Sequence, residues 1–162
     1  MHNDEFFMRR AIALSKSAVA HGNEPFGAVL VKDGEIVFEN ENQIYTRHDP
    51  SFHGEAGLIR EFCAQTGITD LHEYTMYASC EPCFMCSGAL VWVKLGRLVY
   101  GASNDDLETI LGNKGCNCSA LVFENYFWDI HTIWAGLTIT ATGTRYFHLL
   151  IHSISDIFKH RT

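Results

Sequence analysis

Apolar residues near the start of the chain recur every three or four positions, which is the spacing of one face of an α-helix. Asn3 or Asp4 can cap the start of this helix, and His21-Gly22 is a typical end. The pattern therefore predicts a helix of about eighteen residues whose apolar face packs on a core. That face is formed by Phe7, Ala11, Leu14 and Ala18.

Two runs with strand character follow this helix. FGAVLV (26–31) and EIVFEN (35–40) are separated by Lys32-Asp33-Gly34, and Asp-Gly between two such runs is a strong signal for a β-hairpin. The first run is almost wholly apolar. We therefore expect it to be a central strand, buried on both faces of a sheet.

The middle of the chain alternates helix and strand patterns. A helix is predicted over 53–66, ended by Gly67, and a strand over YTMYAS (74–79). Pro82 suits the first turn of a helix that runs to about Lys94, and RLVYGAS (97–103) is a further strand. Strand, helix and strand in this order predict a parallel crossover unit.

The pattern is less regular from residue 103 onward. The aromatic segment 123–134 carries no clear period, whereas LTITATG (137–143) has strand character and 144–158 that of a closing helix. Cys116 and Cys118 are two thiols in a glycine-bearing loop, with no function assigned to them. We see no linker or repeat, so the chain is predicted to be one α/β domain over 1–162.

Composition and charge narrow the class of protein. The chain has 162 residues, 47% of them hydrophobic, which is enough for a core that needs neither disulfides nor a structural metal. A formal net charge of −7 disfavours a broad nucleic-acid-binding face, which would need clustered Lys and Arg. The N-terminus is charged and amphipathic, and no apolar run approaches a membrane span, so we expect a cytoplasmic protein.

Three residues have the chemistry and placement of zinc ligands. His53 begins one predicted helix, and Cys83 and Cys86 lie at the start of the next with Cys-x-x-Cys spacing. A structural zinc site is normally closed by four protein ligands, whereas a catalytic site keeps one position open. The candidates for a fourth ligand are His48, His72, Cys80 and Glu55. His48, five residues before His53, could close the site, whereas Pro82 makes a chelate shared by Cys80 and Cys83 awkward.

Glu55 follows His53 by two residues. From a helix start its carboxylate could take a proton from a zinc-activated water and pass it to a leaving group. Alone, His-x-Glu or Cys-x-x-Cys carries little information. Together, in this order and with Pro82 before the first cysteine, they match the H-x-E…P-C-x-x-C signature of zinc deaminases.

Over about residues 3–110 the sequence resembles the cytidine deaminase-like superfamily, and within it bacterial guanine deaminases and tRNA adenosine deaminases. The resemblance implies a three-layer α/β/α sandwich with a five-stranded mixed sheet, and commonly a homodimer. It also implies one zinc ion held by His53, Cys83 and Cys86, with Glu55 as proton shuttle. The C-terminal segment, about 111–162, diverges. The resemblance is carried by PFGAVLVKDGEIV, HDPSFHGE, CEPCFMCSGALVW and LGRLVYGASND.

The resemblance also implies substrate contacts, each with a plainer alternative. Asn42 would hydrogen-bond the base, or be a turn residue. Phe26 and Trp92 would wall the pocket, or pack in the core. Asp106 would accept hydrogen bonds from the amino and imino groups of guanine, or cap a helix. Gly54 stands where alanine is usual; its backbone amide would hold a substrate oxygen, and the missing methyl predicts a slightly wider pocket.

We therefore expect a zinc-dependent hydrolytic deaminase that acts on a small aminated heterocycle, with guanine or a related purine, pterin or triazine favoured over cytosine. A tRNA adenosine deaminase is the alternative within the same chemistry. A non-catalytic domain with a structural zinc is the alternative outside it.

Overall fold

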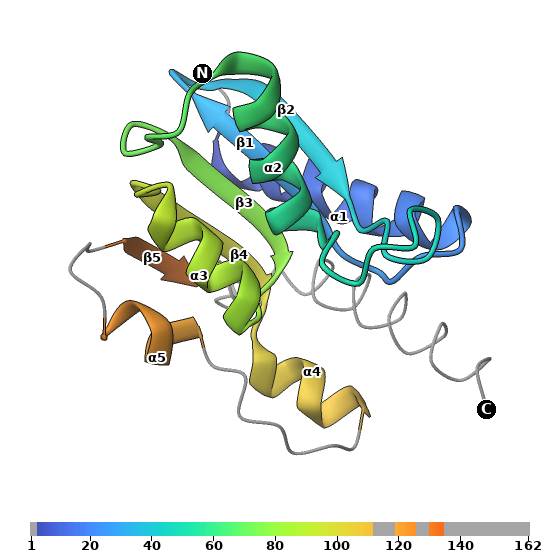
Figure 1. Cartoon of the computed structure of the whole chain (residues 1–162). Helices are drawn as coiled ribbons and strands as arrows, with labels where there is room; N and C mark the ends of the chain where they lie inside the picture. The colour runs from blue at the N-terminus through green and yellow to red at the C-terminus, as the bar shows by residue number, and fades with distance from the viewer. Residues whose placement is uncertain (1–2, 112–118, 126–129, 135–162) are drawn as a thin grey trace.

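The computed structural model describes residues 3–111, 119–125 and 130–134. Helices and strands alternate along these residues (Figure 1), which confirms the predicted α/β class. In chain order the elements are α1 (Asp4–Ala20), β1 (Gly27–Lys32), β2 (Glu35–Glu41), α2 (Gly54–Thr66), β3 (Thr75–Cys80), α3 (Phe84–Trp92), β4 (Arg97–Ala102), α4 (Asn104–Leu111), α5 (Ser119–Phe123) and β5 (His131–Trp134).

The strands form one mixed sheet in the order β2-β1-β3-β4-β5. β1 runs antiparallel to both β2 and β3, whereas β3, β4 and β5 are parallel to one another. The apolar β1 is therefore an inner strand, as its sequence predicts. α3 connects the parallel neighbours β3 and β4, which confirms the crossover unit.

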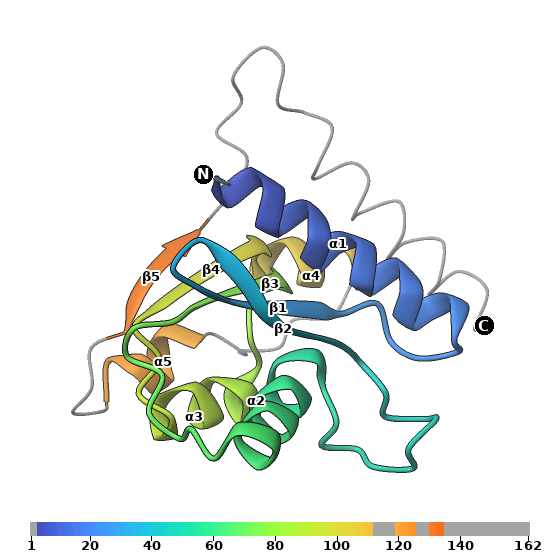
Figure 2. The same cartoon turned by 90° about the horizontal axis from the view of Figure 1, so that it is seen from above.

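Helices cover both faces of this sheet. α1 lies on one face, and α2 and α3 lie side by side on the other (Figures 1 and 2). Alternate residues of β1 pack against the helices on the two faces of the sheet, because successive strand side chains point to opposite faces. Ala28 and Leu30 belong to the apolar cluster under α2 and α3, whereas Val29 and Val31 belong to the cluster under α1.

The ends of the first two helices follow local sequence signals. The Asn3 side chain accepts a hydrogen bond from the Phe6 N–H at 3.1 Å, and so caps α1 as predicted. α2 ends at Gly67, whose backbone is left-handed with φ 74° and whose N–H donates to the Cys63 carbonyl. Glycine adopts this conformation without steric cost, which explains why the helix stops there.

α3 is shorter than its sequence predicts. Cys83 is its N-cap, so Pro82 precedes the helix instead of occupying its first turn. The helix ends at Trp92, and Lys94, which was expected to be helical, has a left-handed backbone with φ 52°. The shortening matters for function because it places Cys83 on an extended turn before the helix.

The C-terminal part was predicted less well. β5 falls inside the aromatic segment that carried no clear period in the sequence. The strand expected at 137–143, the helix expected at 144–158, and Cys116 and Cys118 all lie outside the described residues. In the described part of the chain, no helix is long and apolar enough to cross a membrane.

Candidate metal centre and active site

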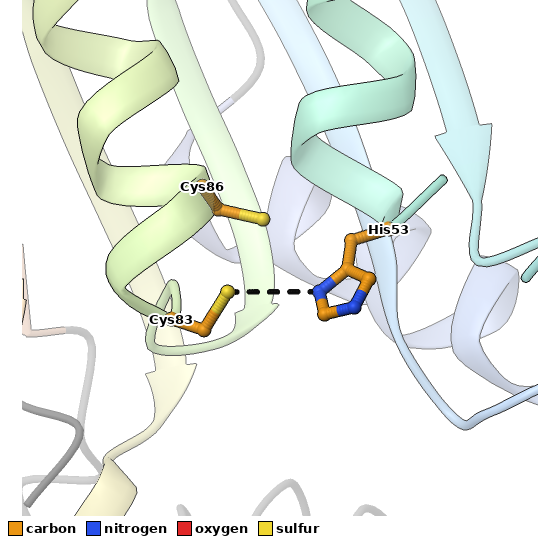
Figure 3. Close-up of side chains that lie close together, drawn as sticks. All are labelled: His53, Cys83 and Cys86. Carbon is orange, nitrogen blue, oxygen red and sulfur yellow. Dashed lines mark hydrogen bonds between the residues drawn. The ribbon is translucent and has the colours of Figure 1, made fainter. Parts of the chain in front are cut away.

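The three predicted ligands meet at the N-terminal ends of two neighbouring helices. His53 comes from the start of α2, and Cys83 and Cys86 from the start of α3 (Figure 3). One ligand atom from each residue lies within 4.8 Å of those of the other two. The Cys83 Sγ is 3.6 Å from the His53 Nδ1. Residues thirty positions apart in the sequence are thus brought within reach of one ion.

Helix geometry directs two of these side chains toward the site. His53 and Cys83 are both N-cap residues with extended backbone, and neither side chain caps its own helix. An N-cap side chain that does not bond to the first turn can point outward, away from the helix it precedes. The partial positive charge at each helix start favours thiolate over thiol. The folding of α2 and α3 therefore prepares both the position and the charge of the ligands.

The three side chains influence one another's protonation. Hydrogen bonding from the Cys86 thiol, together with His53, lowers the pKa of Cys83 to about 4. The hydrogen bond to Cys83 raises the pKa of His53, and the same thiolate, with burial, raises the pKa of Cys86. One thiolate, one thiol that a cation would deprotonate and one imidazole form a donor set typical of zinc.

None of the candidates for a fourth ligand joins this group; the exposed His72 pairs with Asp70 instead. Within residues 3–111, 119–125 and 130–134, the cluster of possible metal ligands consists of His53, Cys83 and Cys86 alone. His48 is exposed in the loop after β2, and Cys80 is buried at the end of β3, where burial raises its pKa. Three protein ligands with a remaining open position are typical of a catalytic zinc site.

Glu55 lies beside the ligands without being one of them. Its side chain is 6% exposed, and its Oε2 accepts a hydrogen bond from the Cys86 thiol at 3.4 Å. Burial raises the pKa of this carboxyl group. A carboxylate in this environment holds a proton more readily than one in water, which suits it to proton transfer near neutral pH.

Asn40 supports the start of α2, a role that the sequence did not suggest. Its buried side-chain Nδ2 donates to the Gly54 carbonyl at 3.0 Å and to the His53 carbonyl at 3.5 Å. Gln43 donates to the Asn40 Oδ1 at 2.9 Å and so orients the amide. An asparagine within a predicted strand was the available sequence signal for this role. The carbonyls to which it donates lie more than ten residues away in the sequence, so no local pattern identifies them.

Three of the predicted substrate contacts lie together next to this helix start. The Asn42 N–H donates to the Phe26 carbonyl at 2.9 Å, which joins the end of β2 to the start of β1. Gly54 is the first residue of α2 and lies against Gly27 of β1. Asn42 is 1% exposed; its Oδ1 accepts from the Ile44 N–H, but its Nδ2 has no partner among the described residues.

The structure does not bring Trp92 to the same place. Trp92 is the last residue of α3, about 12 Å along the helix axis from its start. It is also 76% exposed. In the described part of the chain Trp92 thus lies away from the metal ligands, and its place in the pocket wall stays a prediction.

Asp106 caps the helix that contains it. Its Oδ2 accepts from the Ser103 N–H at 2.8 Å and from the Ser103 Oγ at 2.7 Å, and its own N–H donates to the Ser103 Oγ. This is a capping box, in which Ser103 is the N-cap of α4 and Asp106 lies three residues further on. A serine three positions before an acidic residue was the sequence signal for it. The substrate role of Asp106 stays a prediction.

Comparison with known proteins agrees with this geometry. Residues 1–102 match the family described as the cytidine and deoxycytidylate deaminase zinc-binding region. The chain belongs to this family. As in its relatives, the ion that His53, Cys83 and Cys86 can hold is zinc.

Individual members of the deaminase family give a finer comparison. The chain is 42% identical over 105 residues to guanine deaminase of Bacillus subtilis, covering 64% of this chain and 67% of the relative. It is 35% identical over 98 residues to the tRNA-specific adenosine deaminase of Aquifex aeolicus, covering 60% and 65%. These matches thus span about two thirds of each relative. The crystal structure of the Bacillus subtilis guanine deaminase superposes with a TM-score of 0.65 at 33% identity, covering 85% of this chain and 88% of that one.

Proposed function

We propose that this deaminase-family chain is a zinc-dependent hydrolase that releases ammonia from a small aminated heterocycle, with guanine as the favoured substrate. The observation that carries the proposal is the buried Glu55 carboxyl beside a three-ligand metal group. A structural zinc site has no need of a buried carboxyl group next to its ligands. The non-catalytic alternative leaves Glu55 unexplained, since burying a carboxyl group costs stability.

The residues divide the chemistry between them. His53, Cys83 and Cys86 would hold zinc, which when bound would supply a Lewis acid that makes a water molecule nucleophilic near neutral pH. Glu55 would accept the first proton of the water and give it to the ring nitrogen. It would then accept the remaining hydroxyl proton, as that hydroxyl becomes the carbonyl, and give it to the departing amine. Water and the C–NH₂ group become C=O and ammonia. Because burial raises its pKa, Glu55 can hold a proton between these two transfers.

Substrate orientation falls to residues on the β1–α2 side of the site. The Asn42 Nδ2 is a buried donor without a partner among the described residues, so it can donate to an oxygen or ring nitrogen of the base. The Gly54 N–H, at the first turn of α2, has no acceptor within its own helix and can bind a substrate oxygen. The half-buried Phe26 side chain packs against the apolar cluster under α1, so its contact with the substrate stays a prediction.

Charge supports a small substrate over tRNA. Every Lys and Arg side chain in the described part of the chain other than Lys16 is paired with a carboxylate, so these cations are not gathered into a phosphate-binding face. The formal net charge of −7 points the same way. The similarity to tRNA-specific adenosine deaminases supports tRNA adenosine as the second candidate substrate. Homodimer formation, implied by the resemblance, stays a prediction.

An ammonia-release screen tests the proposal. The zinc-loaded chain is incubated separately with guanine, guanosine, cytosine, adenine, ammeline and a tRNA anticodon stem-loop. We expect turnover of guanine and at most slow turnover of the others. Turnover confined to the stem-loop would overturn the choice of guanine, and absence of turnover on all six would overturn the proposed enzyme.

A further inference from the structure

Glu81 lies in the short turn between β3 and α3, two residues before the ligand Cys83. Its backbone N–H donates to the Ala102 carbonyl at 2.8 Å, which fixes the turn to the end of β4. β3 and β4 are parallel, so their carboxyl ends meet at the same edge of the sheet. In α/β proteins this edge is where ligands bind. Residues that follow β4 therefore emerge next to the metal group.

The Glu81 side chain joins two helix starts at this edge. Its Oε2 accepts from the Asn104 N–H at 2.9 Å, at the first residue of α4. Its Oε1 accepts from the Ser119 N–H at 3.0 Å and from the Ser119 Oγ at 2.6 Å, at the first residue of α5. Asn104 and Ser119 are buried, so the carboxylate satisfies donors that water reaches poorly.

α5 is also held by apolar packing, since Val122 and Phe123 lie against the cluster under α2 and α3. Of the described side chains of α4, Leu107 is the one that packs against a buried apolar cluster. Ser103 and Asp106 bond to each other in the capping box. Ser103 and Asp106 thus stabilise the start of α4, and the hydrogen bond from the Asn104 N–H to Glu81 connects that start to the turn before Cys83.

We propose that Glu81 is a positioning residue, which holds the starts of α4 and α5 beside the metal group so that they form one wall of the substrate site. This inference rests on the proposed deaminase function. Glu81 does not contact the reacting atoms. Its loss is expected to weaken substrate binding, because the wall moves, while the three zinc ligands stay in place.

The test uses the zinc-loaded full chain and its Glu81→Gln variant. Glutamine keeps the length but offers one oxygen and one NH₂ group, so it cannot accept from both helix starts. We expect amide hydrogen exchange at Asn104 or Ser119 to be at least about tenfold faster. We also expect KM for guanine to rise about tenfold with kcat within about twofold, and the zinc content to be unchanged. Glu73→Gln, at an exposed glutamate that pairs with Lys32, is the matched control and should alter none of these.

Ser119→Ala is a milder second variant that removes one donor to Glu81. In a double-mutant cycle, the effect of Ser119→Ala on KM should largely disappear in the Glu81→Gln background. Unchanged exchange in Glu81→Gln, faster exchange with unchanged KM, loss of zinc, or additive effects in the cycle would each overturn the proposal. If the wild-type chain turns over no substrate, the proposed function fails, and the exchange result still decides whether Glu81 holds the two helices.

Discussion

Gly54 and Gly27 lie against each other, but replacement by alanine should have opposite effects on stability at the two positions. A Cβ added at Gly54 would meet its nearest neighbours, all backbone atoms of Gly27, at 3.4–3.5 Å, which is ordinary van der Waals contact. A Cβ added at Gly27 would meet the Ala11 carbonyl oxygen at 2.5 Å and the Leu14 Cβ at 2.6 Å. Gly54→Ala should therefore fit without movement, whereas Gly27→Ala should force α1 away from β1.

The magnitudes follow from helix propensity and burial. Replacing glycine by alanine in a helix gains about 0.5–1 kcal/mol, and the added buried methyl about 0.8 kcal/mol at most. At the first residue of α2 both gains are partial, so we expect Gly54→Ala to raise the free energy of unfolding by about 1 kcal/mol. For a chain of this size that raises Tm by about 2–4 °C. Gly27→Ala should lower the free energy of unfolding by about 3 kcal/mol or more.

Urea denaturation and calorimetry of the two zinc-loaded variants measure both values. KM for guanine should stay within about twofold in Gly54→Ala, because the methyl lies against Gly27 instead of facing the ligands. Destabilisation of Gly54→Ala by more than about 1 kcal/mol, or a neutral Gly27→Ala, would refute this reasoning.

Three further predictions concern other parts of the chain. Cys86→Ser should reduce bound zinc, measured by mass spectrometry of the metal, from about one ion per chain to below about 0.1, whereas Cys63→Ser should retain it; equal retention would contradict the ligand assignment. Asn42→Asp keeps the acceptor for Ile44 but removes the Nδ2 donor, so KM for guanine should rise about tenfold or more with zinc unchanged, and an unaltered KM would exclude the contact. Burial and the hydrogen bond to Asp4 raise the pKa of Tyr77 to about 12, above its unfolded value near 10, so stability should fall as pH rises from about 10 to 12. Urea titrations should show that fall diminished in Tyr77→Phe, and identical slopes would contradict it.

The first hundred residues could be predicted because their signals are local. Asp33-Gly34 forms the hairpin turn between β1 and β2, with positive φ at both residues. Gly67 ends α2, and the apolar run of β1 gives an inner strand. Helix starts that carry His53 and Cys83 then had to meet, once both helices packed on one face of the sheet. Fold and metal group are therefore consequences of short-range patterns.

Other features depend on partners distant in sequence. Asn40 bonds to carbonyls thirteen and fourteen residues away, and Glu81 accepts from residues 23 and 38 positions further on. No local pattern distinguishes either residue from an ordinary polar side chain. The position of Trp92 is hard to predict for a related reason, since the exact start and end of α3 decide which residues face the site.

Glu55→Gln tests most directly whether this chain is a zinc-dependent deaminase with Glu55 as its proton carrier. Glutamine preserves the size of the side chain but cannot accept and return a proton. With zinc content equal to that of the wild type, kcat for ammonia release from guanine should fall by about 10³-fold or more. Turnover within about tenfold of the wild type, in a variant that retains zinc, would contradict the proton-transfer role and with it the proposed mechanism.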